Sequence, residues 1–274
     1  MISPLRKVVV YAASLSILFL FLSPMLWVIN ISLKQRKDIF VWPPKFFSFD
    51  VTFENYVNVL STSGRFSSFI LNSLIIAGVS TTVAVVVGSL AAFALSGKRK
   101  RDSFAWSYWM LSFRMMPPVA LVIPYYVVFQ QIGMLGSLWA VALTHSVFSI
   151  AIVIWTMKNF FDEIPPEIEE AAFVDGASRW QVFRLIALPI SKAAVAASAI
   201  FAFLTSWNEF LFAVILSRSR TQTVPVAISS FVGEVYVSWG ELAAATIVGI
   251  LPALLFAFVG QRFLLIGLAP GAVK

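Results

Sequence analysis

The feature that most restricts this chain is a series of long apolar segments with few or no charged side chains. Between charges and prolines the sequence contains six of them, at residues 8–33, 68–96, 104–129, 138–157, 193–216 and 243–265. About twenty apolar residues in a helix are enough to cross a hydrocarbon core of about 30 Å. We therefore predict an all-α membrane protein with six transmembrane helices.

Composition favours a membrane protein over a soluble one. Hydrophobic residues make up 59% of the 274 residues and charged residues 12%, about half the charged share of a soluble domain. This excludes an ordinary soluble enzyme and a disordered chain, and the absence of cysteine excludes a disulfide scaffold and thiolate metal sites. A transmembrane β-barrel fits poorly, because its strands alternate in polarity over about ten residues.

Lysine and arginine predict the orientation, because they are retained on the cytoplasmic side of short loops. If the basic cluster at residues 98–101 is cytoplasmic, both termini are inside, with twelve basic residues on the inner side and seven on the outer side. The first segment alone favours the reverse orientation, but the four-residue cluster outweighs it. That segment is too long for a cleavable signal peptide. We predict a multi-pass protein of the inner (plasma) membrane with both termini cytoplasmic.

The longest inner loop, about residues 158–192, carries six of the thirteen acidic residues and signals for two short helices. Pro165 and Pro166 suit the first turn of a helix, with acids nearby to complement its dipole, and Gly176 is placed to end it. A second helix is expected to begin after Ser178 and to stop before Pro189. On these signals alone, the two helices could simply join two spans.

The same loop contains Glu170-Ala171-Ala172, then Gly176, then the Ile-Ala-Leu-Pro sequence of residues 186–189. This pattern resembles the EAA signature of permease subunits in binding-protein-dependent ABC importers, and every signature position matches. Similarity to the carbohydrate branch of that family, specifically to maltose-permease-G-like subunits, extends along nearly the whole chain. It is carried by residues 43–44, 52–56, 113–118, 207–210, 261–264, 267–268 and 271–274, whereas Pro270 departs from the family pattern.

The resemblance implies the type I importer fold, with residues 1–274 as one transmembrane permease domain and outer loops at about 34–67 and 217–242. It also implies a function: a permease subunit that forms half of the translocation pathway of a carbohydrate ABC importer. The implied partners are a second permease, two ATPase subunits, an extracytoplasmic binding protein and the carbohydrate. In the family, the inner loop is the coupling helix that docks in a cleft of the ATPase. In this sequence, the residues that the resemblance implies for this contact are Glu170, Ala171, Ala172, Phe173, Asp175, Gly176, Leu188 and Pro189.

The side chains of the coupling segment suit such a contact. Ala171 and Ala172 keep the docking face small, and Gly176 permits the backbone to reverse. Glu170 offers a carboxylate to a basic group, and Phe173 is expected to fill an apolar pocket. The alternative is that the acidic run is only a solvated face. The thirteen glycines include no G-x-x-x-x-G-K-[ST] loop, so ATP and Mg are expected on the ATPase subunits. We predict no enzyme activity, cofactor or metal for this chain.

Two sites with charged residues inside the predicted spans are candidates for the translocation pathway. Arg114 lies in the third segment, where an arginine costs roughly 2.5–3.5 kcal/mol on insertion scales. The prolines that follow it predict a broken helix lining a cavity. Trp207, Asn208 and Glu209 form the second site, and an aromatic face beside amide and carboxylate groups suits a sugar. The alternative is an Arg114–Glu209 ion pair that holds two helices together.

The outer loop at residues 217–242 is apolar for a segment outside the bilayer and needs a surface to pack on. In the family, the matching loop reaches into the docked binding protein, which assigns this contact to Ser230, Phe231, Val232, Gly233 and Glu234. Gly233 would supply a flexible tip. Packing against the chain's own helices is the alternative.

Two other functions remain open at this point. An ion-coupled secondary transporter could use Arg114, His145 and Glu209, although His145 is expected to be a hydrogen-bonded packing residue. The complete EAA signature and the lack of a repeated hydropathy pattern argue against this function. A structural membrane-assembly factor would carry no substrate at all.

Overall fold

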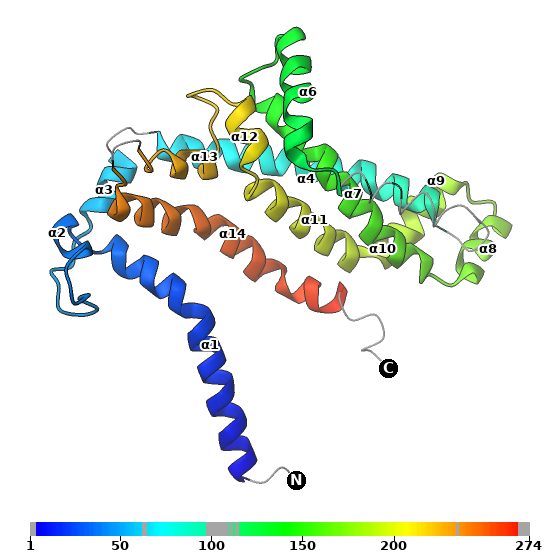
Figure 1. Ribbon diagram of the computed structural model, residues 1–274. Helices are drawn as coiled ribbons and strands as arrows, with labels where there is room; N and C mark the ends of the chain where they lie inside the picture. Colours follow the sequence, from blue (N-terminus) through cyan, green and yellow to red (C-terminus); the bar gives the residue numbers. More distant parts are fainter. Residues whose placement is uncertain are drawn as a thin grey trace. The chain divides into compact units, whose positions relative to one another are not determined.

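The computed structural model describes residues 4–61, 65–96, 109, 112, 115–233 and 236–267. Within these ranges the regular structure is helical, apart from an isolated antiparallel bridge between Val232 and Val237. The helices are α1 (Pro4–Ser32), α2 (Arg36–Ile39), α3 (Glu54–Ser61), α4 (Phe66–Leu95), α6 (Pro118–Gln131), α7 (Leu138–Asp162), α8 (Pro166–Val174), α9 (Arg179–Val182), the π-helix η1 (Phe183–Ala187), α10 (Leu188–Ile190), α11 (Lys192–Trp207), α12 (Leu211–Leu216), α13 (Val224–Ser229) and α14 (Trp239–Gly267) (Figure 1).

Four of the described helices are long and apolar enough to cross a membrane: α1, α4, α7 and α14. They match the first, second, fourth and sixth predicted segments. The third segment is described at residues 109, 112 and 115–129, and Arg114 and the basic cluster at residues 98–101 lie outside the described residues. The fifth segment is corrected, because it is two helices, α11 and α12, separated by residues 208–210.

The chain divides into two compact units, Met1–Ser67 with Ala227–Leu251, and Ser68–Val226 with Pro252–Lys274. The second boundary falls inside α14 at Pro252. A proline has no backbone N–H, so Pro252 leaves one hydrogen bond out of the ladder of a helix that continues through it. The expectation of one permease domain over residues 1–274 stays a prediction.

Small residues allow the helices of the second unit to approach closely. Helices α7 and α11 pack along their length. A Cβ on Gly88 of α4 would lie 2.7 Å from Val153 of α7, and one on Gly260 of α14 would lie 2.1 Å from Ile200 of α11. Close backbone approach at small residues is the usual basis of helix packing in membranes.

In the first unit, polar side chains connect the end of α1 to α3 and to the start of α14. Asn55 donates from Nδ2 to the backbone oxygens of Ser32 and Lys34, both at 2.9 Å. The hydroxyl groups of Ser32 and Tyr56 lie 2.8 Å apart. Asn58 donates to Glu241 on α14 at 3.1 Å. These bonds fix the segment that follows the first span.

Candidate functional site

Helix α8 begins and ends at the residues that the sequence signals indicate. Pro165 is the N-cap, Pro166 is the first helical residue, and two acids lie in the first turn. At the other end, Gly176 has φ +85°. Its N–H donates to the oxygen of Phe173 at 3.1 Å, and the N–H of Ala177 donates to Ala172 at 2.9 Å. This is the Schellman arrangement, and it confirms the prediction that Gly176 ends the helix.

The second helical piece of the loop begins as predicted but continues further. Ser178 and Gln181 form a reciprocal capping box at the start of α9. The helix then passes through the π-turn η1, in which Leu188 donates to Phe183, and ends at Ile190. Pro189 therefore does not stop the helix. It lies in the first turn of α10, directly after the wider π-turn. At this position its missing N–H does not remove an i to i−4 hydrogen bond between regular α-turns.

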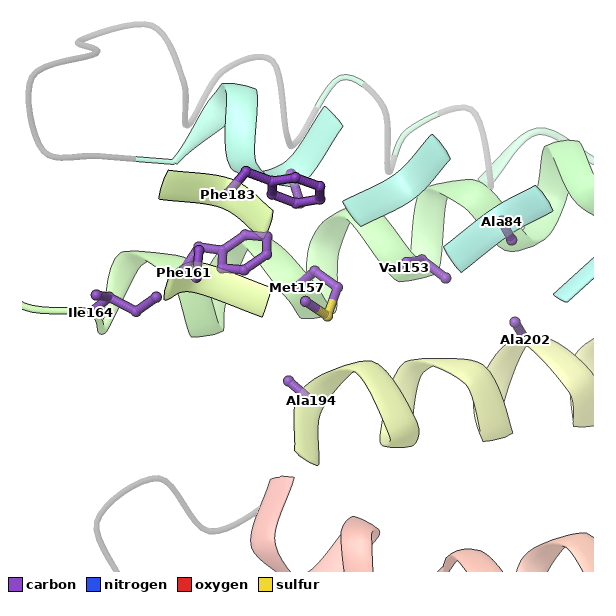
Figure 2. Close-up of a cluster of buried hydrophobic side chains, with 10 residues drawn as sticks. Ala84, Val153, Met157, Phe161, Ile164, Phe183, Ala194 and Ala202 are labelled. Carbon is purple, nitrogen blue, oxygen red and sulfur yellow. The ribbon is translucent and has the colours of Figure 1, made fainter. Parts of the chain in front are cut away.

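A cluster of aromatic and small side chains fixes this loop to the membrane helices. The Phe183 cluster consists of Ala84, Ala92, Val153, Met157, Phe161, Ile164, Phe183, Ala187, Ala194 and Ala202 (Figure 2). The Phe183 ring lies 5.2 Å from Phe93 of α4, 6.4 Å from Phe161 of α7 and 5.5 Å from Trp180. The second helix of the loop is thus packed onto α4 and α7.

Residues 208–210 interrupt the fifth apolar segment, and the Glu209 side chain bonds to the start of α12 and to α7. Its carboxylate accepts from the backbone N–H groups of Phe212 at 2.9 Å and Ala213 at 3.1 Å, at the start of α12. It also lies 2.9 Å from Nε2 of His145 on α7, whose Nδ1 lies 2.8 Å from the hydroxyl of Ser206 on α11. His145 therefore connects to both halves of the broken segment.

The family described as "Binding-protein-dependent transport system inner membrane component" matches residues 84–266, which include the coupling loop and the break. The chain belongs to this family. Its members are permease components of ABC importers, so the ion-coupled transporter left open by the sequence is set aside.

Two relatives and one solved structure resemble this permease over most of its length. The trehalose transport system permease protein SugB of Mycobacterium tuberculosis is 34% identical over 92% of either chain. The trehalose/maltose transport system permease protein MalG of Thermococcus litoralis is 29% identical over 98% of either chain. A bacterial ABC transporter involved in alginate import has a TM-score of 0.75 at 20% identity, covering 96% of this chain and 98% of its own. That likeness shows the type I importer permease fold.

The coupling residues of this permease differ in exposure. Ala172 is buried against the chain, whereas Glu170, Ala171, Phe173, Asp175 and Gly176 are exposed, and Leu188 and Pro189 lie on α10. Val174 is 88% exposed, and the signature did not indicate it. An apolar residue at a helix C-terminus, beside a glycine in an inner loop, is the sequence signal that could have found it.

The candidate pathway residues also have different surroundings. Trp207 is buried and stacks on Phe203, with ring centroids 5.7 Å apart, whereas Asn208 is exposed and donates to the oxygen of Leu204. Phe210, which the sequence analysis did not select, is 42% exposed. Arg114 lies outside the described residues, so its pairing with Glu209 stays a hypothesis. His145 is hydrogen-bonded, as predicted.

The candidate contact for a binding protein lies in a short hairpin that follows α13. Gly233 donates to the oxygen of Tyr236 and Ser238 donates to that of Phe231, both at 3.1 Å. Val232 is exposed and bridges to Val237, whereas Glu234 lies outside the described residues. In the described part of the chain, no three His, Asp or Glu side chains gather as a metal site would require.

Proposed function

We propose that this chain is the permease subunit that forms half of the pathway of a carbohydrate ABC importer, with ATP hydrolysed by separate ATPase subunits. Its implied partners are a second permease, two ATPase subunits with ATP and Mg, and an extracytoplasmic binding protein. The relatives named for trehalose and maltose transport support a carbohydrate substrate. Those two sugars are the first to test against the cognate binding protein.

The observation that carries the proposal is the exposed apolar surface at the end of α8. Val174 is 88% exposed and Phe173 is 41% exposed, next to the left-handed turn at Gly176. Neither side chain is in a membrane span, so water contact there is unfavourable until a partner covers it. A helix that presents such a surface, and that contacts α9 of the segment packed onto α4 and α7 through the Phe183 cluster, fits a docking element for the ATPase.

We further propose that the break between α11 and α12 contributes to the substrate route. The polar and charged groups inside the predicted spans make Trp207, Asn208, Glu209 and Arg114 the candidates for it. In the described residues, Asn208 and Phe210 are the exposed side chains at the break. An amide and an aromatic face suit the hydroxyl groups and C–H faces of a sugar. Asn208→Ala is expected to raise KM for sugar uptake while basal ATPase activity stays unchanged, and an unchanged KM would contradict this role.

The orientation is part of the proposal, with both termini and α8 in the cytoplasm and residues 34–67 and 217–242 outside. Ser230, Phe231, Val232, Gly233 and Glu234 would then face the binding protein. The chain has no cysteine, so single cysteines at Val174 and Asp50 can be compared. An impermeant reagent should label position 50 and not position 174 in intact cells, and the reverse pattern would contradict the orientation.

A matched pair of valine variants tests the docking surface. Burying a valine contributes about 1.5–3 kcal/mol, so Val174→Asp should weaken binding of the ATPase subunits by at least about tenfold. Val51 is also exposed but lies after α2, far along the chain from the loop, and Val51→Asp should leave ATPase binding unchanged. Copurification of the ATPase with each variant is the measurement. Equal binding by both variants would contradict docking through α8.

A further inference from the structure

Residues 40–47, here called the aromatic loop, expose large apolar side chains between α2 and α3. Phe40 is 72% exposed, Trp42 is 87% exposed and Phe47 is 97% exposed. Figure 1 shows this segment as the blue loop beside α2. An exposed apolar group of this size in a protein marks an interaction surface or a membrane contact.

Contacts with α1 determine the level of the aromatic loop along the first span. The rings of Trp27 and Phe46 lie 5.4 Å apart, and Asn30 donates from Nδ2 to the oxygen of Phe46 at 2.7 Å. Trp27 precedes the end of α1 at Ser32 by five residues, or about 7.5 Å at 1.5 Å per residue. The loop therefore folds back beside the last two turns of an apolar helix, none of whose hydrophobic window is buried within the chain.

Lys34 fixes the base of the aromatic loop. Its side chain is buried, with Nζ 5.3 Å from the ring centroid of Trp27 and 5.0 Å from that of Phe49. Burial lowers the pKa of Lys34, while the charge of Asp38 opposes that shift. Cation–π contacts on both sides hold residues 34–49 in one arrangement against α1.

Equal numbers of cationic and anionic side chains line a surface beside the aromatic loop. A hollow of about 550 Å³ is lined by Lys37, Asp38, Lys45 and Asp50. Lys45 donates to Asp38 at 2.8 Å, and this hydrogen bond holds the pKa of Asp38 below its usual range. Asp38 is therefore ionised at neutral pH. Two cations and two anions suit a zwitterionic surface better than a strongly anionic one.

We propose that the aromatic loop inserts into the headgroup–acyl boundary of the bilayer leaflet at the C-terminal end of α1. Aromatic side chains favour this zone, where their rings meet the acyl chains and their edges meet water and headgroups. The contacts with Trp27 and Asn30 hold the loop at that depth, and the balanced charges face the zwitterionic headgroups. The loop then anchors the outer end of the first span.

Spin labels at single cysteines test this insertion in the assembled importer, reconstituted into phosphatidylcholine nanodiscs with cysteine-free partner subunits. The test positions are Trp42 and Phe47. Leu20, which is exposed on α1, is the control inside the bilayer, and the exposed Asp50 is the aqueous control. Collisions with oxygen report the apolar phase, and collisions with a water-soluble nickel complex report the aqueous phase.

Labels at both test positions are expected to prefer oxygen several-fold over the nickel complex, as at Leu20, whereas the label at Asp50 prefers nickel. The preference is expected to persist when part of the lipid is anionic. Nickel preference at either test position would show that the loop lies in water, and protection from both reagents would show that a protein subunit covers it. Oxygen preference that requires anionic lipid would contradict the charge-balanced contact. Each of these results would overturn the proposal.

Discussion

Gly176 sets the backbone reversal at the end of α8, and its φ of +85° is a conformation that residues with a Cβ adopt only at a cost. No atom lies within 4 Å of a Cβ built there, or of one built on Gly78 in α4. The two glycines thus differ in backbone conformation and not in the space around them. They form a matched pair for substitution by alanine.

We expect Gly176→Ala to destabilise the turn by about 1–2 kcal/mol, because the left-handed conformation carries that penalty for a residue with a Cβ. Gly78→Ala should be neutral or slightly stabilising, since alanine is the better helix former. Hydrogen exchange at the amide of Ala177 should increase in the first variant alone. Similar exchange in the two variants would mean that the Schellman turn does not depend on glycine.

Glu209 and His145 should be energetically coupled, because one carboxylate serves the imidazole and two backbone N–H groups. Residues in one hydrogen-bond network typically show interaction free energies of about 0.5–3 kcal/mol. A double-mutant cycle of Glu209→Gln and His145→Phe, read by thermal unfolding of the complex, should give coupling in this range. The cycle of Asn208→Ala with His145→Phe is the control, and additive effects in both cycles would contradict the network.

At the scale of elements, α7 connects the two parts of the site. Phe161 near its C-terminal end belongs to the Phe183 cluster, and His145 contacts the break between α11 and α12. These residues are sixteen positions apart in one helix, or about 24 Å along its axis. A rigid helix of this length can carry a displacement of the coupling loop to the break as a whole-body movement.

Phe183→Ala should weaken this connection. Truncating a buried phenylalanine costs about 3–5 kcal/mol, and here the loss falls on the contacts that join the loop to α4 and α7. We expect ATP hydrolysis to continue while sugar uptake per ATP falls. Leu185→Ala changes an exposed side chain in the same π-turn. It should leave the ratio of sugar uptake to ATP hydrolysis unchanged. A normal ratio in the Phe183 variant would show that the cluster does not transmit movement.

The sequence predicts α8 accurately because its signals are local, from Pro166 at the start to Gly176 at the end. The break at residues 208–210 is different, because it is stabilised by a bond to His145, 64 positions away from Glu209. Hydropathy detects the apolar segment and not this bond. The different burial of Ala171 and Ala172 is likewise set by packing between helices. The residues next to them in the sequence do not indicate this packing. The continuation past Pro189 depends on a π-turn that lacks a sequence signal of its own.

At the scale of the whole molecule, the chain has these spans and no G-x-x-x-x-G-K-[ST] loop, and ATP hydrolysis by separate subunits is part of the proposed function. In the proposed function, the exposed end of α8 is the surface on which the ATPase subunit acts. The described residues thus combine membrane helices, an exposed apolar end of α8, and the Phe183 cluster that packs the loop onto α4 and α7. If the proposed function is correct, transport by this importer is driven by ATP and depends on α8.

Uptake of labelled trehalose or maltose by proteoliposomes tests this requirement most directly. The vesicles contain the complete importer, with the loaded binding protein on one side and ATP on the ATPase side. We expect uptake that requires ATP, persists in the presence of ionophores, and is lost in Val174→Asp but retained in Val51→Asp. Uptake that proceeds without ATP and collapses with the ionophores would contradict it.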